Sequence, residues 1–410
     1  MFSPLDNVTF HPFPNGLRLY LKEDRTWPLV SVQAWVRVGS VDEEAAAAGV
    51  SHVLEHMVLK GTTHHAAADI SRWVESQGGA LNAETAKEYT HYYIDVPSVG
   101  TRKAVHLLAE LLHRAALDPE EWKRECPVIL EEIKRRNDDP DALLWDLLNE
   151  ALYDDPCCRR PVIGYPETVG RIDRDALARF YRAHYTAGRC LMVIAGDFKS
   201  RDVLRWVEAE FAGMPAGEPP APRRARSAAR ARQIGVRKAV KQAYAGFGFA
   251  TPPSSHGDHE ALDLIAAILG DGRGARLVRI LREEKKLVWS VDAANLTQEG
   301  PGLFAVFCEC RAENLRALKR ELGRIFIELR RFPPGAQELT RAKNILQTAW
   351  LQGFETYHNQ AATLGGFALE NQLPRLRSYL PRLRALSRSD VSRVIGRYFG
   401  LSLACAVIQA

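Results

Sequence analysis

The composition of this chain is that of an ordinary soluble globular protein. It has 410 residues, 46% of them hydrophobic and 26% charged, with a net charge of +5. A chain of this length forms two or three domains. No apolar run approaches the roughly 18 residues that a membrane-spanning helix needs. The charge is small for the length, so we expect neither nucleic acid nor a membrane as a partner.

The cysteines and the first residues indicate a reducing compartment. The seven cysteines are odd in number and include no Cys-x-x-Cys pair, so neither a disulfide framework nor a thiolate zinc site is expected. The first sixteen residues, MFSPLDNVTFHPFPNG, lack the basic region and apolar core of a signal peptide. We therefore expect a cytoplasmic protein.

The first elements along the chain are a strand and a buried helix. Residues 29–40, LVSVQAWVRVGS, are strand-like. Residues 49–62, GVSHVLEHMVLKGT, show no alternation and carry apolar residues at helical spacing. These apolar residues are Val50, Val53, Leu54, Met57 and Val58.

This helix also contains two histidines and a glutamate that a buried helix would normally exclude. His52 and His56 are four residues apart and so lie on one face, one turn above the other, where the Glu55 carboxylate can reach the same point. Two imidazoles and a carboxylate suit Zn²⁺ in a catalytic site, with Glu55 as the general base on water. The alternative is two core histidines that hydrogen-bond each other. Chance would produce only roughly 0.02 such five-residue matches in this composition, which favours the metal.

The helix expected over residues 118–141 offers the third ligand. Asp118 caps its start. Glu131 has the spacing of a surface salt-bridge partner, whereas Glu132 is predicted to face inward as a metal ligand. One face carries Glu125, Val128, Ile129 and Glu132.

The two halves of the chain resemble distant repeats. Residues 103–133 and 318–348 are each predicted to form a helix, a proline turn and a second helix, and Pro119 matches Pro334. Each half also has strand-like runs and ends in a helix followed by an apolar strand. We expect an α+β fold with two homologous domains, each a mainly antiparallel sheet covered by helices.

A proline-, alanine- and arginine-rich segment, 215–235, separates the halves. It has no apolar periodicity and is predicted to be an extended linker. Its arginines have no interleaved aromatic residues, so a solvated tether is favoured over a nucleic-acid contact. The predicted domains are residues 1–214, with the histidine motif, and residues 236–410, without a metal site.

The motif His-x-x-Glu-His, followed by Gly61 and Thr62 and by a glutamate 76 residues later, resembles the pitrilysin/insulysin family of zinc peptidases, the inverzincins. Within the family, the chain is most similar to the bacterial proteins that resemble mitochondrial processing peptidase. The resemblance covers essentially the whole chain and implies that His52, His56 and Glu132 bind zinc.

The resemblance also implies roles for other residues of the first half. It implies that Glu55 activates water and that Glu125 is a supporting acid near the site. Residues 78–97 resemble the family's edge-strand segment that pairs with substrate backbone, with Asn82 and Ala83 at its functional position. For Asn82 alone, an ordinary turn residue is an equally good interpretation.

The second half departs from the family pattern. It lacks His-x-x-Glu-His, and Gln347 stands where the repeat would place a zinc-binding glutamate. In the family this half usually carries an arginine and, seven positions on, a tyrosine that hold the substrate. Here Arg282 is in place, but position 289 is Trp289, whose indole donates only through nitrogen.

Two functions of different class follow. The first is a zinc endopeptidase that hydrolyses peptides or unfolded segments, as the catalytic member of a heterodimer whose partner supplies the arginine–tyrosine pair; a homodimer is possible. The second is a non-catalytic scaffold or core subunit of a larger complex. Scaffolds of this kind tend to lose the metal ligands, and this chain keeps them, which favours the peptidase.

Overall fold

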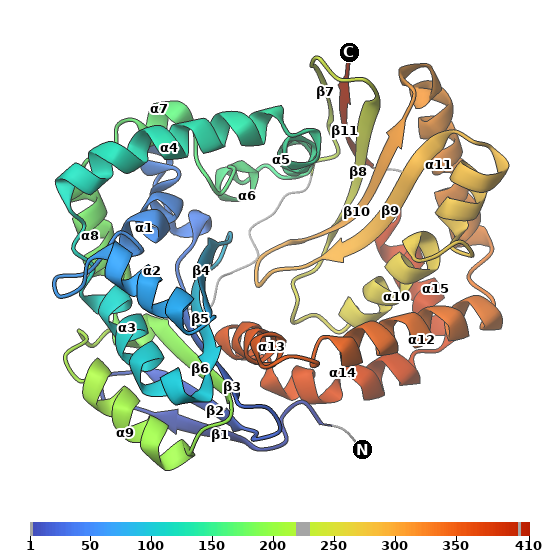
Figure 1. Ribbon diagram of the computed structural model, residues 1–410. Helices are drawn as coiled ribbons and strands as arrows, with labels where there is room; N and C mark the ends of the chain where they lie inside the picture. Colours follow the sequence, from blue (N-terminus) through green and yellow to red (C-terminus); the bar gives the residue numbers. More distant parts are fainter. Residues whose placement is uncertain (1–2, 219–229, 401–402) are drawn as a thin grey trace. The chain divides into compact units, whose positions relative to one another are not determined.

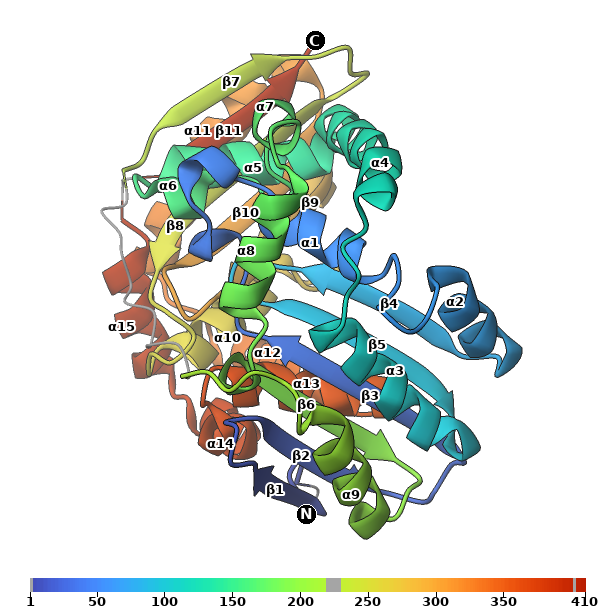
Figure 2. The ribbon, with the colours of Figure 1, turned by 90° about the vertical axis from the view of Figure 1, so that its left-hand side faces the viewer.

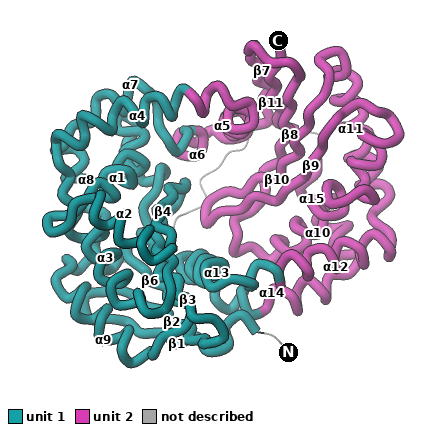
Figure 3. Tube along the Cα trace, viewed as in Figure 1, with its two compact units in different colours: residues 1–134, 160–222, 352–377 teal, residues 135–159, 223–351, 378–410 magenta. Residues whose placement is uncertain are grey.

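The computed structural model describes residues 3–218, 230–400 and 403–410, which form two compact units (Figures 1 and 3). Unit 1 and unit 2 do not coincide with the contiguous ranges 1–214 and 236–410, because each unit also takes a helical segment from the other half of the chain. Unit 1 comprises residues 1–134, 160–222 and 352–377; unit 2 comprises residues 135–159, 223–351 and 378–410.

Unit 1 is built on a six-stranded, mainly antiparallel sheet in the described part of the chain. Only the β2–β6 pair is parallel. β4 lies at one end of the strand order and so leaves one edge unpaired in the sheet. In spatial order the strands are β1 (Val8–Pro12), β2 (Arg18–Glu23), β6 (Cys190–Gly196), β3 (Leu29–Val36), β5 (Thr90–Pro97) and β4 (Ala80–Thr85).

Helices cover both faces of this sheet. α3 (Thr101–His113) packs beside α9 (Ser200–Phe211) on one face (Figure 2), and α13 (Tyr357–Leu369) packs against β3 and β6 on the other. A methyl group at Gly365 of α13 would overlap the indole of Trp35, so glycine permits this close approach. The remaining helices of four or more residues that begin in unit 1 are α1 (Val50–Val58), α2 (Ala67–Ser76), α4 (Pro119–Asp138), α7 (Pro166–Val169), α8 (Arg174–His184) and α14 (Leu373–Ala385).

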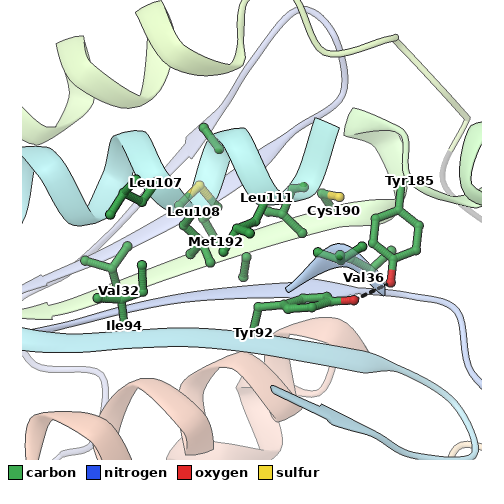
Figure 4. Close-up of a cluster of buried hydrophobic side chains, with 14 of the residues drawn as sticks. Val32, Val36, Tyr92, Ile94, Leu107, Leu108, Leu111, Tyr185, Cys190 and Met192 are labelled. Atoms are coloured by element: carbon green, nitrogen blue, oxygen red, sulfur yellow. Dashed lines mark hydrogen bonds between the residues drawn. The ribbon is translucent and has the colours of Figure 1, made fainter. Parts of the chain in front are cut away.

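The core of unit 1 lies between the sheet and α3 (Figure 4). Val32 and Ile94 of the sheet face Leu107 and Leu108 of the helix, and all four are at most 2% exposed. Burial of this apolar area is the main stabilising contribution to such a layer.

Unit 2 repeats the topology of unit 1 on a five-stranded sheet within the described residues. The strand order β7-β11-β8-β10-β9 corresponds to β2-β6-β3-β5-β4 of unit 1. In both series the first pair of strands is parallel and the following pairs are antiparallel. The predicted repeat is therefore confirmed at the level of strand order and direction. The strands, in spatial order, are β7 (Gln233–Arg237), β11 (Ala404–Gln409), β8 (Ala243–Thr251), β10 (Gly302–Cys310) and β9 (Val288–Leu296).

Helices also cover both faces of the second sheet. Phe247 of β8 belongs to the core under α10, α11 and α15, whereas Gly246 approaches Leu144 of α5 on the opposite face. α5 comes from the first half of the chain, as α13 of unit 1 comes from the second. The helical segments are α5 (Pro140–Leu152), α6 (Pro156–Arg159), α10 (His259–Gly270), a π-helix (Val278–Glu284), α11 (Leu315–Arg331), α12 (Ala336–Gln352) and α15 (Arg388–Tyr398).

The predicted α+β fold with two helix-covered sheets is confirmed, with one correction to the linker. Residues 219–229 of the predicted linker 215–235 lie outside the described residues. Its last three residues are not linker, because β7 begins at Gln233 and pairs with β11. All seven cysteines are free thiols. Among the described residues, none of the helices has the length and apolar character needed to span a bilayer.

Candidate metal centre

The helix that carries both motif histidines, α1, is held at its N-terminus by a buried carboxylate. Glu43 is 5% exposed, and its two oxygens accept hydrogen bonds from the backbone N–H groups of Gly49 and Ser51, both at 2.8 Å. Burial raises the pKa of Glu43 to about 7, although these hydrogen bonds and nearby Arg160 act in the opposite direction. Gly49 has a φ of +97°, which favours glycine at this helix start.

The apolar residues predicted to bury α1 are all buried, and the histidines lie on its partly exposed side. Their rings are in edge contact, with centroids 4.6 Å apart. Glu132 of α4 faces both: its Oε1 is 3.8 Å from Nε2 of His52, and its Oε2 is 3.4 Å from Nε2 of His56. One ligand atom from each of the three residues lies within 4.8 Å of the others.

The helix that supplies Glu132 begins as predicted but presents a different face. α4 starts at Pro119, and Oδ1 of Asp118 accepts from the backbone N–H of Glu120 at 2.7 Å. Ile129 is fully buried, but Val128 is 53% exposed, so the expectation that it faces inward is wrong. The inward stripe follows Glu125, Ile129 and Ile133, since positions four apart on a helix overlie one another. Glu131 is exposed beside Lys134, as predicted.

Glu125 contacts the metal centre through His56. Its Oε1 is 2.8 Å from Nδ1 of His56, and its Oε2 is 2.5 Å from Nζ of Lys60. Burial tends to raise the pKa of Glu125, but the hydrogen bonds from His56 and Lys60 prevail and lower it. If an ionised Glu125 accepts the Nδ1 proton, Nε2 of His56 is left with a lone pair that it can offer to a metal ion between His52, His56 and Glu132. Acids in this position orient metal-binding imidazoles in many metalloproteins.

Glu55 lies beside the three candidate ligands and has a different partner. Its side chain is buried, and its Oε2 accepts a hydrogen bond from Oγ1 of Thr85, the last residue of β4. Burial raises the pKa of Glu55, the Thr85 hydrogen bond opposes this, and the nearby Glu132 carboxylate adds to the increase. The raised pKa makes Glu55 a stronger base than a solvated carboxylate.

The donor set fits Zn²⁺. Two imidazole nitrogens and one carboxylate oxygen are the protein ligands of many catalytic zinc sites, where one position stays open. In the parts of the chain that the structure describes, this is the one group of three or more His, Cys, Asp or Glu residues with converging ligand atoms.

The edge-strand residues lie next to this centre. Asn82 and Ala83 are in β4, paired with Tyr93 and Tyr92 of β5. Asn82 is exposed and Ala83 packs against the core. Since Thr85 of the same strand contacts Glu55, the unpaired edge of β4 starts at the metal centre.

A cavity of about 730 Å³ lies at the other end of the same strand, entirely within unit 1. Its lining includes Ala80 of β4, Asp95 of β5, and the apolar residues Trp27 and Leu29, which are 65% and 50% exposed. At about 3.4 Å per residue, Ala80 is about 17 Å along β4 from Thr85.

The residues predicted in the second half lie in unit 2. Arg282 belongs to the π-helix and pairs with its neighbour Glu283, its Nη2 2.8 Å from Oε1. Trp289 is in β9 and is 50% exposed. Gln347 accepts hydrogen bonds from Arg384 at 2.9 and 3.0 Å, so an ordinary polar pair replaces the ligand position in this repeat.

Sequence reasoning missed three residues of the centre: Glu43, Lys60 and Thr85. Glu43 caps a helix that begins seven positions later, outside the local spacing of ordinary capping motifs. Lys60 follows the helix at a position where charged residues are usually solvated. Thr85 reaches Glu55 only through the pairing of β4, which no local pattern encodes.

Comparisons with known proteins agree with this geometry. Residues 18–164 match the family model described as insulinase (peptidase family M16), and residues 171–346 match the one described as peptidase M16 inactive domain. An uncharacterized zinc protease of Streptomyces coelicolor is 30% identical over 95% of this chain and 88% of its own length. One from Bacillus subtilis is 28% identical over 96% of each chain.

Solved structures share the fold. A protease from Helicobacter pylori aligns over 100% of both chains with a TM-score of 0.92 and 22% identity. A peptidase M16 inactive domain from Pseudomonas fluorescens aligns over 98% of both chains with a TM-score of 0.91 and 20% identity. The resemblance to the pitrilysin family is thus confirmed by sequence and by fold: the chain belongs to peptidase family M16.

Proposed function

We propose that this protein is a zinc-dependent endopeptidase that hydrolyses peptides or unfolded segments of proteins. The observation that carries the proposal is the convergence of His52, His56 and Glu132 beside a buried acid, Glu55, that is held by a threonine. A metal-binding site without catalysis would not need this additional carboxylate.

The proposed roles follow from the contacts. His52, His56 and Glu132 hold the zinc ion, which supplies Lewis-acid chemistry when bound. Glu55 takes a proton from the attacking water and passes it to the leaving amine; its carboxylate lies beside the three proposed ligands and is held by Thr85, as a general base requires. Glu125 fixes the His56 ring, and Lys60 keeps Glu125 ionised.

The substrate is proposed to bind as an added strand on β4. Its edge is unpaired within the sheet and begins beside Glu55, and strand addition binds extended chains mainly through backbone hydrogen bonds. A peptide on this edge would run from the metal centre toward the cavity at Ala80. Asn82 and Ala83 are the proposed backbone contacts.

A partner chain is proposed for full activity. Arg282 is present, but Trp289 stands where the family usually has a tyrosine. We therefore propose a heterodimer in which a related chain supplies the arginine–tyrosine pair. The alternative of a non-catalytic scaffold is less well supported, because the three proposed metal ligands and Glu55 are all present and lie close together.

The test is Glu55→Gln, which keeps the shape of the side chain and removes the base. We expect about one tightly held zinc per chain, as in wild type, while turnover of a fluorogenic peptide falls roughly 10²–10⁴-fold. Glu131→Gln, on the exposed face of α4, should change neither quantity. Parallel loss of zinc and activity in Glu55→Gln would contradict the assigned role.

A further inference from the structure

A second pair of imidazoles lies outside the metal centre. His65, in the loop that follows α1, has its Nε2 3.1 Å from Nε2 of His106 on α3. The two rings are nearly perpendicular, at 88°, and both residues are partly exposed. The pair therefore joins the α1–α2 loop to the helical layer of unit 1 at a point open to solvent.

The separation of the two nitrogens matches that of ligands on one metal ion. Two imidazole nitrogens at about 2.0–2.1 Å from a tetrahedral zinc ion lie about 3.3 Å apart. The observed 3.1 Å requires only a small adjustment of two partly exposed rings.

A carboxylate favours the tautomer of one ring that metal binding needs. Nδ1 of His106 lies 2.9 Å from Oε2 of Glu210, on the neighbouring helix α9. If Nδ1 donates its proton to this acid, the lone pair of His106 Nε2 points toward His65. The same carboxylate–histidine arrangement supports metal ligands in established sites, and Glu125 and His56 repeat it in the metal centre.

The groups around the pair favour a neutral His65 and separate it from the adjacent histidine. Burial and the neighbouring Lys103 lower the pKa of His65, which disfavours the protonated form of the ring that cannot bind a metal ion. His64, next in sequence, turns away, with its Nδ1 2.9 Å from Oε2 of Glu110. We therefore do not include His64 among the ligands, and His64→Ala can serve as the control substitution.

We propose that His65 and His106 bind a divalent transition-metal ion, with zinc as the reference ion and water completing its coordination. With two protein ligands, the site holds the ion more weakly and exchanges it faster than the three-ligand centre. Occupation would tie the loop after α1 to α3. This proposal is independent of peptidase activity, and the competing interpretation is a neutral hydrogen bond between the two imidazoles.

Equilibrium dialysis against zinc alone tests the proposal, first in wild type and then in His52→Ala/His56→Ala, which disables the metal centre. We expect two zinc ions per chain in wild type at excess zinc and one in the double variant. Adding His106→Ala or His65→Ala to the double variant should remove that remaining ion, whereas adding His64→Ala should not.

Circular dichroism identifies any variant that fails to fold, and the loop substitution His65→Ala provides a second, less disruptive route to the same result. If the double variant with His65→Ala or His106→Ala, folded, still binds as much zinc as its parent, the pair is only a hydrogen bond and the proposal is wrong. Loss of zinc with His64→Ala as well would also overturn the assignment of ligands.

Discussion

Replacing Glu43 by glutamine should make unit 1 respond differently to pH. Burial raises the pKa of this carboxyl from 4.5 to about 7, so between these values the folded protein keeps a proton that the unfolded chain releases. The contribution of Glu43 to the free energy of unfolding is therefore fully present below pH 4.5. It is lost as the pH rises through about 7, where Glu43 must ionise in the folded protein. The pKa difference corresponds to about 3 kcal/mol in the free energy of unfolding.

Glu43→Gln carries no titratable group and can still accept one of the two backbone hydrogen bonds from Gly49 and Ser51. The difference in free energy of unfolding between wild type and variant should therefore shift by about 3 kcal/mol between pH 4.5 and 8, to the disadvantage of wild type at high pH. Other titrating groups are common to both proteins and cancel in this difference.

Urea unfolding of metal-free protein, followed by circular dichroism at several pH values, gives the two free energies. Because the chain has two compact units, hydrogen exchange of peptides from residues 43–58 should be followed in parallel to report on α1 itself. Glu44→Gln, at an exposed neighbouring carboxylate, is the matched control and should show no such shift. A wild-type/Glu43→Gln difference that stays constant with pH would refute the reasoning.

Three further outcomes are expected. Glu125→Ala should weaken zinc binding by about 10–100-fold in a competition titration, because His56 loses its orienting acid; an unchanged affinity would contradict this role. Trp27→Ala should raise KM by about 2–10-fold for peptides long enough to reach the cavity from the metal centre, and leave shorter peptides unaffected. The isolated, zinc-loaded chain should be weakly active and gain about 10²–10³-fold when mixed with a related chain carrying the arginine–tyrosine pair; full activity alone, abolished by Trp289→Ala, would reject the heterodimer.

Much of the candidate site was predictable because three of its residues are close together in the sequence. His52, Glu55 and His56 occupy one helix, so the 3.6-residue period alone places them together. Glu132 was predicted as a ligand because a carboxylate expected to face inward needs a partner, and the structure places it beside both imidazoles. The same reasoning wrongly placed Val128 on the buried face. Glu125 and Glu132 are seven residues apart, which is slightly less than two helical turns, so the buried stripe of α4 turns toward Ile133 and leaves Val128 exposed.

The exchange of helices between the units was not predictable from local patterns. α5 and α13 have the amphipathic or apolar character of any covering helix, and nothing in their sequences states which sheet they cover. The assignment depends on long-range fit, such as the contact of Gly365 with Trp35 and of Leu144 with Gly246. Contiguous domain boundaries therefore describe the repeat in sequence but not the compact units.

The two units share a fold but differ in the side chains that would carry out the proposed reaction. Both halves keep the same strand order, yet α10 has apolar residues where α1 has its motif, and Gln347 pairs with Arg384 where Glu132 meets two imidazoles. A fold shared by both halves cannot by itself account for activity. The proposed chemistry must instead come from the few side chains that distinguish α1, α4 and the end of β4, and substitutions there should affect turnover without changing the fold.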